Sequence, residues 1–578
     1  MGQEPAPSKP EPTPTWCIAC VALSALLGLA LIADQAFRMS ATYDEVTYLR
    51  VAAHWWRTGQ QAEISRMGSP LTFWKLQQVP TLWVLDRVGR SAWVDDPIGH
   101  QAELLPWVRI GGSWTWLASL AVVVAWARRL QGPRGMAMAA ALFALGPNLL
   151  AHGALATMEM PLVACSSAAL LAFWLFLVSG RRRDFAASAA LAGIGMSCKF
   201  TMAVVPPILA LIWAVNLWTR TDEKAGSSET GRLGRIARTV VLGMLAYGAI
   251  LVAADFAVTG FATIPLSSRN GMHPTLAGRF GPAITRLASK VLETPIPADW
   301  VGFFNQLRYQ GEGGSSYLLG ERRTTGWTLY YPIALACKVP LAFWALMIAR
   351  TLMGRRGRPE AREWVLPAFA FAFLLVAILG SKRNYGVRYL LPMAVPAVVW
   401  ASALAEGGRW WRRIAAVGLV GMAAAVASIH PHELTFFNRA AGGPIGGRKL
   451  LSDSNLDWGQ GAKSLAKLQR ERPEFRELSL FYFGDTDPGH YGVEGRRIVF
   501  DAVKTPDGLP PSLTVETPFL AVSASLQWGP WGPAGYFREL DEVAPVAFTD
   551  DSTIAIYRTS DLTRKRESSP VRKGRGPG

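Results

Sequence analysis

Long apolar runs recur along most of this chain and predict helices that cross a membrane. About 20 apolar residues are needed to span the hydrocarbon core of a bilayer. About eleven runs approach or reach that length, and the shortest is the fifth. They predict transmembrane helices over residues 16–36, 108–127, 136–152, 160–179, 185–199, 201–218, 239–256, 328–349, 364–380, 389–405 and 414–430.

The regions between and after these runs have other patterns. Residues 37–107 and 257–327 are long connections within a predicted transmembrane domain that covers residues 16–430. After residue 430, the stretches ELSLFYFGD, RRIVFDAV, TPFLAVSAS and STIAIYR predict strands, and GAKSLAKLQRER predicts a helix. We therefore expect a small α/β domain over residues 431–558.

Basic residues predict the orientation of the helices. Loops on the cytoplasmic side are enriched in Lys and Arg. If the N-terminus is cytoplasmic, the inside loops hold nineteen Lys and Arg residues, over residues 128–134, 181–184, 220–238, 350–362 and 406–413. The short outside turns near 152–159 and 199–200 hold only Lys199, whereas the turn 381–388 is basic and breaks the bias. Both long connections and the C-terminal domain are therefore expected to be extracytoplasmic.

Composition supports a membrane protein and argues against two other classes. Half of the residues are hydrophobic and 17% are charged, whereas a soluble domain has about 25% charged residues. The net charge of +17 comes from short clusters between apolar runs, and no compact basic domain that would bind nucleic acid stands out. The five Cys residues lie in or beside apolar runs, so they predict buried thiols, not a disulfide framework. The terminal segments 1–15 and 559–578 are predicted to be disordered, the first of them on the cytoplasmic side.

Three acidic residues on the predicted outer side are candidates for chemistry. Asp44 and Glu45 are adjacent in YDEVTY, just after the first run, and Glu159 lies where the chain re-enters the membrane in ATMEMP. A carboxylate at such a boundary is expected to face water, a cavity or a partner. A solvated loop or turn would also accommodate each of them.

Three basic residues lie on the same predicted side. Lys199 stands between apolar residues in GMSCKFT, Lys338 precedes Val339 and Pro340 within an apolar run, and Arg388 opens the tenth run in VRYLLP. Pro340 is expected to kink its helix, and the Lys338 charge is expected to face a cavity. Snorkelling of Lys199 and interfacial anchoring of Arg388 are the alternatives. Acids opposite bases suit the transfer of a group from an anionic leaving group to a hydroxyl.

These motifs together resemble a family of membrane enzymes. The chain is similar to the multi-spanning, polyprenyl-phosphate-sugar-dependent glycosyltransferases of the C-type superfamily, and closest to bacterial family 39-type enzymes related to protein O-mannosyltransferases and aminoarabinose transferases. The resemblance rests on YDEVTY, ATMEMP, GMSCKFT, YLLGE with YYPIALACKVP, RYLLP, and HPHELTFFNRAAGGPIGG leading into LSDSNLDWGQ. The WWDYG signature of oligosaccharyltransferases is absent, which argues against transfer of a whole glycan to Asn.

The resemblance implies a function and a set of roles. It implies transfer of a monosaccharide, hexosyl or pentosyl and mannosyltransferase-like, from a polyprenyl phosphate to an extracytoplasmic protein, lipid or glycan, with inversion. Asp44 would be the base or the acid that orients the acceptor, with Glu45 as its support. Glu159 would be a second acid near the donor sugar, although the family usually has Asp there. Lys199 and Arg388 would contact the lipid phosphate. Asp453, Asn455 and Asp457 carry a family signature to which we assign no role.

Two alternative functions and one possible cofactor remain to be compared with the sequence. A polytopic transporter or lipid flippase would have charged or helix-breaking sites near mid-membrane in corresponding halves, and the sequence has no internal repeat. A mere anchor for a binding domain would not need about eleven spans. Asp44, Glu45 and Glu159 could bind a divalent cation through oxygen, although no spacing demands it. The resemblance favours a multi-pass protein of the bacterial inner membrane with its active site outside.

Overall fold

A computed structural model of the chain describes residues 12–60, 74–220, 229–265, 290, 293–354, 362–498, 513, 515–533 and 535–562. Residues 1–11 and 563–578, which make up most of the two segments predicted to be disordered, lie outside the described residues.

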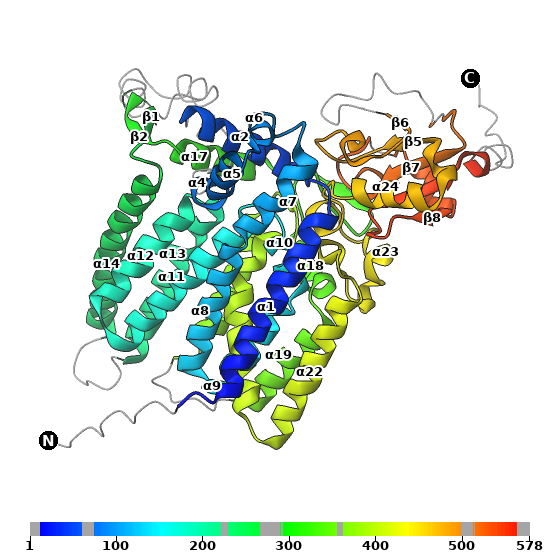
Figure 1. Cartoon of the computed structure of the whole chain (residues 1–578). Coiled ribbons are helices and arrows are strands. Elements are labelled where there is room, and N and C mark those ends of the chain that lie inside the picture. The colour runs from blue at the N-terminus through cyan, green and yellow to red at the C-terminus, as the bar shows by residue number, and fades with distance from the viewer. Residues whose placement is uncertain are drawn as a thin grey trace, which may run out of the picture.

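A bundle of apolar helices forms the body of the protein (Figure 1). Its elements are α1 (Thr15–Arg38), α7 (Gln101–Gly112), α8 (Trp114–Leu130), α9 (Pro133–Ala144), α10 (Pro147–Gly153), α11 (Glu159–Ser179), α12 (Arg182–Met196), η1 (Phe200–Val204), α13 (Val205–Arg220), α14 (Glu229–Val258), α18 (Tyr330–Lys338), α19 (Leu341–Met353), α20 (Val365–Gly380), η5 (Val387–Met393), α21 (Ala394–Ala401), η6 (Ser402–Glu406) and α22 (Arg409–Ala427). The chain is thus a polytopic helical membrane protein, as predicted.

The number of full-length spans is smaller than the number of predicted runs. Within the described ranges, seven helices are long and apolar enough to cross a membrane, and two bent pairs raise this number to nine. The bends measure 64° between α9 and α10 and 106° between α18 and α19. Each of the eleven runs falls on a helix or a bent pair, but α20 has 16 residues and α12 has 15, which is short for a span. All eleven predicted runs are therefore helical, and seven to nine of them pass this length test within the described residues.

The break between α18 and α19 occurs at the predicted proline. Pro340 precedes α19 and has no N–H to continue the helix. Asn438, from a distant loop, donates its Nδ2 to the carbonyls of Ala336 and Val339, and its backbone N donates to Cys337 O at 2.9 Å. The carbonyls released by the break thereby regain donors, which allows a sharp bend inside the bundle.

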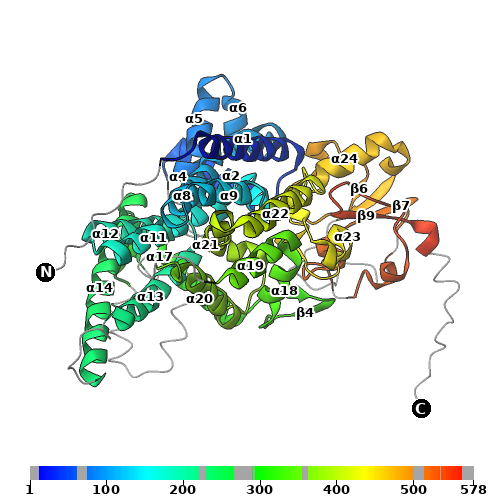
Figure 2. The same ribbon diagram turned by 90° about the horizontal axis from the view of Figure 1, so that it is seen from below.

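Short helices and hairpins cover one end of the bundle (Figure 1). They are α2 (Tyr43–Thr58), α4 (Trp74–Gln77), α5 (Val79–Arg87), α6 (Ser91–Asp95), α17 (Trp300–Glu312) and the paired strands β1 (Thr263–Pro265) with β2 (Pro295–Pro297) and β3 (Ser316–Leu318) with β4 (Glu321–Arg323). Viewed along the bundle, α14 and the C-terminal domain lie on opposite sides (Figure 2). The end that carries these elements is called the capped end below.

The chain after α22 first packs on the bundle. This segment contains η7 (Glu433–Thr435), η8 (Arg439–Ala441), α23 (Gly443–Gly447) and η9 (Asp453–Asn455). Leu434, Phe437 and Trp458 belong to the same buried cluster as the side chains of the spans. Residues 433–458 are therefore part of the core that the transmembrane helices form.

A mixed five-stranded sheet follows, with the order β6-β5-β7-β9-β8. Its strands are β5 (Leu478–Phe481), β6 (Arg496–Arg497), β7 (Phe519–Ser523), β8 (Ala547–Phe548) and β9 (Ile554–Arg558), and the helical elements beside it are α24 (Ala462–Glu471), η10 (Pro473–Arg476), η11 (Pro488–Tyr491), α25 (Ala524–Gln527) and η12 (Arg538–Glu542). β5 runs parallel to β6 and β7, whereas β9 is antiparallel to β7 and β8. The predicted strands and helix are confirmed, except that much of RRIVFDAV lies outside the described residues and β8 was not predicted.

Candidate functional site

Four of the predicted residues come together at the capped end of the bundle. Nη1 of Arg388 lies 3.0 Å from Oδ2 of Asp44 and 3.5 Å from Oε1 of Glu159. Nζ of Lys199 lies 2.7 Å from the same Glu159 oxygen. Asp44, Glu159, Lys199 and Arg388 therefore form one charged cluster, in which two acids alternate with two bases.

The four side chains differ in their access to solvent. The Asp44 side chain is 29% exposed, that of Lys199 is 12% exposed and that of Glu159 is 3% exposed. Arg388 is 9% exposed, and its Nε is buried without a hydrogen-bond partner among the described residues. The cluster thus opens towards solvent at Asp44 and keeps a buried donor at Arg388.

Aromatic rings hold the two cations. The Arg388 guanidinium lies 4.1 Å from the ring centroid of Trp458, and Lys199 Nζ lies 4.4 Å from that of Tyr389. A cation over an aromatic face gains about 0.5–2 kcal/mol, and more when it is desolvated. Trp458 and Tyr389 therefore help to position the two bases, in addition to their ion pairs with Asp44 and Glu159.

Local structure explains how distant residues reach the cluster. Asp44 lies in the first turn of α2, Glu159 is the first residue of α11, and Lys199 is the extended residue before η1. Arg388 lies two residues after Gly386, whose φ of 130° favours glycine. A Cβ atom at position 386 would lie 2.3 Å from Ser454 Oγ, so a larger residue would not fit. Helix starts and a glycine turn therefore place all four side chains at one end of the bundle.

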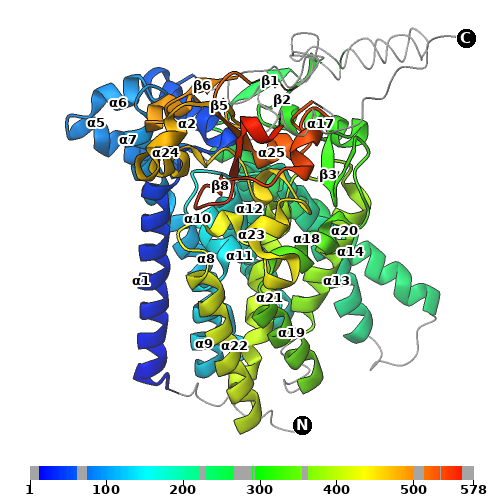
Figure 3. The same cartoon turned by 90° about the vertical axis from the view of Figure 1, so that its right-hand side faces the viewer.

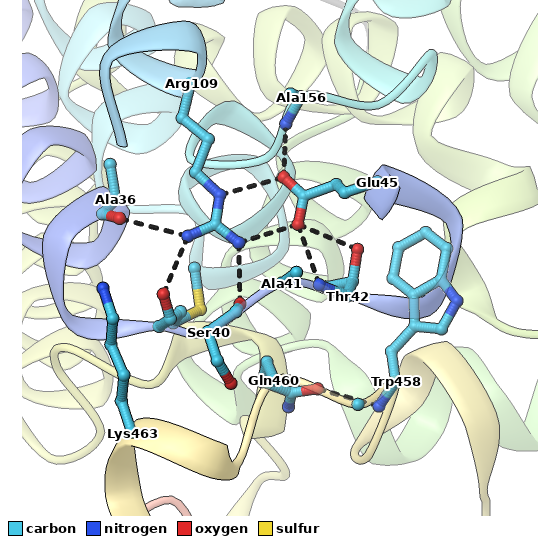
Figure 4. A network of polar contacts seen from close by, with 12 residues as sticks. Ala36, Ser40, Ala41, Thr42, Glu45, Arg109, Ala156, Trp458, Gln460 and Lys463 are labelled. Atoms are coloured by element: carbon cyan, nitrogen blue, oxygen red, sulfur yellow. Dashed lines mark hydrogen bonds and ion pairs between the residues drawn. The ribbon is translucent and has the colours of Figure 1, made fainter. Parts of the chain in front are cut away.

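Glu45 lies next to Asp44 in the sequence but does not join the cluster. Its carboxylate accepts hydrogen bonds from Nε and Nη2 of Arg109 at 2.9 and 2.7 Å, from N and Oγ1 of Thr42, and from Ala156 N (Figure 4). Both partners of the Glu45–Arg109 ion pair have fully buried side chains. Arg109 also donates to carbonyl oxygens of the α1–α2 connection, those of Ala36, Met39 and Ser40. Glu45 therefore fixes the position of α2, and its side chain is fully buried.

Lys338 also lies apart from the cluster, contrary to the prediction that it faces the same cavity. Its Nζ donates to the backbone oxygens of Leu434, at 2.9 Å, and Asn455, and lies 4.6 Å from the Phe437 ring centroid. The residue is 1% exposed. The Lys338 ammonium therefore ties α18 to the segment after α22, and carbonyl dipoles compensate its charge.

Residues 452–460, SDSNLDWGQ, form a loop that connects the cluster to the rest of the protein and is called the signature loop below. Asn455 Oδ1 accepts Val387 N at 2.9 Å at the start of η5. Trp458 O accepts Tyr43 N at 2.7 Å, and Gln460 O accepts Ser40 N at 3.2 Å. The loop thereby holds the start of α2 and the start of η5, which carry Asp44 and Arg388.

The two aspartates of the signature loop are turned towards the C-terminal domain. Oδ2 of Asp453 accepts Trp531 Nε1 at 2.8 Å, and Oδ2 of Asp457 accepts Ser525 N at 2.9 Å. Burial raises the pKa of Asp457 to about 7, although hydrogen bonds from the backbone of Ser525 and Gly459 oppose the shift. These contacts give Asp453 and Asp457 a positioning role that the sequence did not indicate.

Sequence reasoning missed Arg109 and Trp458. Arg109 lies inside the second predicted span, and an ionisable residue in a span is expected to have a partner, so that signal was available. Trp458 is separated by 70 residues from the Arg388 that it covers, and nothing in the sequence relates the two.

Of the three acids considered as cation ligands, Asp44 and Glu159 lie in the charged cluster and Glu45 lies apart. Glu45 is paired with Arg109, away from Asp44 and Glu159. In the part of the chain that the structure describes, no group of three or more His, Cys, Asp or Glu side chains is placed to hold a metal ion. The three acids named from the sequence therefore do not form a joint ligand set.

An apolar cavity of about 290 Å³ adjoins the same part of the bundle. Its walls include Val387, Leu390 and Leu391 of η5, the element that carries Arg388. Val339 and Pro340, at the break between α18 and α19, line it as well. A single short helix thus carries both a cluster base and part of an apolar wall.

The chain is similar to a known protein family and to solved structures. Residues 108–226 match the family described as dolichyl-phosphate-mannose-protein mannosyltransferase. None of the curated protein sequences matches the chain. The crystal structure of ArnT from Cupriavidus metallidurans bound to undecaprenyl phosphate is 14% identical, with a TM-score of 0.44 over 94% of this chain and 98% of that chain. The archaeal oligosaccharyltransferase AglB from Archaeoglobus fulgidus, in complex with an inhibitory peptide and a dolichol-phosphate, is 13% identical, with a TM-score of 0.40 over 96% and 75%.

The family match is the informative comparison. Both TM-scores lie below 0.5, so no conclusion is drawn from the two structural likenesses. The matched segment contains Glu159 and Lys199 of the charged cluster. Over residues 108–226 the comparison confirms the resemblance to the family 39-type membrane glycosyltransferases that the motifs indicate.

Proposed function

We propose that this protein is a membrane glycosyltransferase that transfers a monosaccharide from a polyprenyl phosphate to an extracytoplasmic acceptor. The observation that carries the proposal is the charged cluster, because it combines an accessible carboxylate with two cations that aromatic rings hold in place. A transfer from phosphate to a hydroxyl needs both kinds of group. The family match over residues 108–226 supports the same reaction class.

Arg388 and Lys199 are the groups proposed to bind the donor phosphate. The Arg388 side chain uses Nη1 for both cluster acids, and its Nε is buried without a partner among the described residues. A planar guanidinium offers two parallel donors to a phosphate. The isoprenoid chain of the donor would lie along the apolar cavity that η5 lines. In this arrangement the donor reaches Arg388 from the lipid side.

Asp44 is proposed to act on the acceptor side. The acceptor hydroxyl oxygen forms a bond to the anomeric carbon, and the bond from that carbon to the phosphate oxygen breaks. The electron pair leaves with the lipid phosphate, where Arg388 and Lys199 stabilise the developing charge. The hydroxyl proton goes to the Asp44 carboxylate. Attack opposite the leaving phosphate inverts the anomeric carbon, and Glu159 is proposed to orient the donor sugar and the two bases.

The proposal also covers the membrane, the sugar and the accepting group. We propose that the protein lies in a bacterial inner membrane with the capped end outside. The loops predicted for the opposite end are rich in Lys and Arg, which is typical of the cytoplasmic side. A mannose-like sugar agrees with the description of the matched family. The accepting group is proposed to be a hydroxyl of a protein, lipid or glycan at the outer surface.

A reconstituted transfer assay tests the proposal. The full chain in proteoliposomes is supplied with radiolabelled polyprenyl-phosphate sugars and a crude acceptor membrane fraction. Label is expected to reach the acceptor with the wild-type protein and with Asp34→Asn, because Asp34 lies on α1 in an exposed pair with Arg38. Transfer with Asp44→Asn is expected to fall at least about a hundredfold, the usual scale for a positioned acid–base group. Equal turnover by Asp44→Asn and Asp34→Asn would refute the role of Asp44, and no transfer from any donor would favour the transporter alternative.

A further inference from the structure

α1, α9 and α22 approach one another at the end of the bundle opposite the capped end (Figure 3). Side chains of these three helices line a groove there. Its volume is about 560 Å³, and its walls are almost entirely apolar. We infer that this groove binds an anionic phospholipid of the membrane leaflet at that end, with the phosphate on Arg134 and Arg412 and the acyl chains between the three helices. The inference concerns a site remote from the charged cluster and does not depend on the proposed function.

The walls leave room because their side chains are short. Ala137, Ala141 and Ala144 of α9 face Ala415 and Ala416 of α22 across the groove. Alanine methyl groups cannot fill the space between neighbouring helices, whereas a flexible acyl chain can, and close packing is what stabilises helices within a bilayer. A chain of lipid in the groove would therefore complete the contact between α9 and α22.

The third wall comes from a helix that is largely exposed on the surface of the bundle. In its most apolar window, α1 has only 22% of its residues buried inside the protein. Leu23 and Leu27 line the groove and remain 65% and 46% exposed. Trp16, which is 52% exposed, lies at the start of α1 and also lines the groove, and tryptophan is typical of the membrane–water boundary. The groove thus runs from that boundary into the apolar zone, as a phospholipid does.

The charges at the mouth select an anionic headgroup. Arg134 begins α9 and Arg412 lies in the first turn of α22, and both line the groove. Neither guanidinium forms an ion pair with a carboxylate within the described residues. The nearby Glu406 carboxylate accepts the backbone N–H groups of Arg134 and Gly135, so it caps α9. Two basic side chains above an apolar groove are complementary to a phosphate that carries acyl chains.

The site would affect the distant cluster through α1. The C-terminal end of α1 supplies the Ala36 carbonyl to Arg109, and the residues that follow supply those of Met39 and Ser40. A lipid that fixes α1 against α9 and α22 therefore stabilises the connection that holds Glu45 and the start of α2. Bound lipid is expected to stabilise the folded protein as any ligand of the native state does.

The test compares lipids and matched arginine variants. The full chain is purified in zwitterionic detergent and titrated with phosphatidylglycerol, with phosphatidylcholine or with inorganic phosphate. Retained lipid is counted by native mass spectrometry, and thermal unfolding is recorded in parallel. Phosphatidylglycerol is expected to remain bound and to raise the unfolding temperature, whereas phosphatidylcholine and inorganic phosphate are not.

The double variant Arg134→Gln/Arg412→Gln removes both proposed phosphate contacts. At about 1 kcal/mol for each arginine near a headgroup, it should bind phosphatidylglycerol about thirtyfold more weakly. The matched control Arg409→Gln/Arg413→Gln removes the same charge from the same helix end, outside the groove, and should retain the lipid. Ala416→Phe, which fills the groove at an exposed position and keeps all charges, should displace it.

Two results would overturn the inference. Equal loss of lipid in the two double variants would show a diffuse basic surface with no defined site. Undiminished binding in Ala416→Phe, with normal unfolding in detergent, would show that the acyl chains do not occupy the groove.

Discussion

Replacement of Arg109 by methionine should destabilise the fold by several kcal/mol. In the native protein the Arg109–Glu45 pair is fully buried, and Nε, Nη1 and Nη2 of Arg109 all donate to oxygens. Methionine would leave the Glu45 carboxylate buried with three of its five donors, which come from Thr42 and Ala156. Removal of one partner from a buried ion pair costs about 3–5 kcal/mol. Because three donors remain, we expect a loss of about 3 kcal/mol.

The measurement is the free energy of unfolding by reversible titration with sodium dodecyl sulfate in mixed micelles, followed by tryptophan fluorescence. The control is Arg496→Met, since the Arg496–Glu516 pair has side chains that are 67% and 85% exposed and should contribute about 0–1 kcal/mol. The double variant Glu45→Met/Arg109→Met should recover part of the loss, because no unpaired charge remains buried. A loss for Arg109→Met within about 1 kcal/mol of that for Arg496→Met would refute the reasoning.

Three further predictions concern the signature loop and its contacts. Burial raises the pKa of Asp457 to about 7, above its unfolded value of about 3.9, so the wild-type protein should lose roughly 2–3 kcal/mol of stability between pH 5 and pH 8; equal pH dependence in Asp457→Asn would contradict this. Trp458→Leu should lower kcat/KM for the donor about tenfold, because Arg388 loses its aromatic support, and Trp458→Phe should lower it less; initial rates at varied donor concentration measure both. Lys338→Met should reduce the free energy of unfolding by about 1–3 kcal/mol, since the Leu434 and Asn455 carbonyls lose a hydrogen-bond donor. The KM for the sugar donor should stay unchanged in the folded fraction. A raised KM would show that Lys338 contributes to binding of the sugar donor.

Most of the fold could be predicted because a membrane span needs only local information. Every predicted run falls on a helix, since a bilayer demands continuous apolar length whatever the neighbours are. The sharp bend at Pro340 could be expected, but its stability could not, because the donor that satisfies the open carbonyls is Asn438, about a hundred residues later. Strand prediction succeeded where a strand is central and apolar, as in β5 and β9, and failed for the two-residue edge strand β8.

Four of the six predicted site residues lie together in the structure, whereas Glu45 and Lys338 are buried beside other partners. Asp44 and Glu45 are adjacent in sequence, but successive residues of a helix point about 100° apart, so one faces Arg388 and the other faces Arg109. The sequence motif could not separate them. Lys338 was placed in a cavity because its charge needed compensation, whereas the compensating carbonyls belong to Leu434 and Asn455. Such long-range partners are set by packing, and a single sequence does not reveal them.

The position of the signature loop sets where this protein can be cut and recombined. A chimera joined at residue 431, where the composition changes, would exchange the loop together with the sheet, so the backbone acceptors of Ser40 and Tyr43 would come from the foreign chain. A junction after Gln460 would keep those acceptors with the bundle and transplant only α24 and the strands. The exchangeable module therefore begins about thirty residues later than the apparent domain boundary, and shuffling between relatives should preserve the folded bundle and its charged cluster only at the later junction.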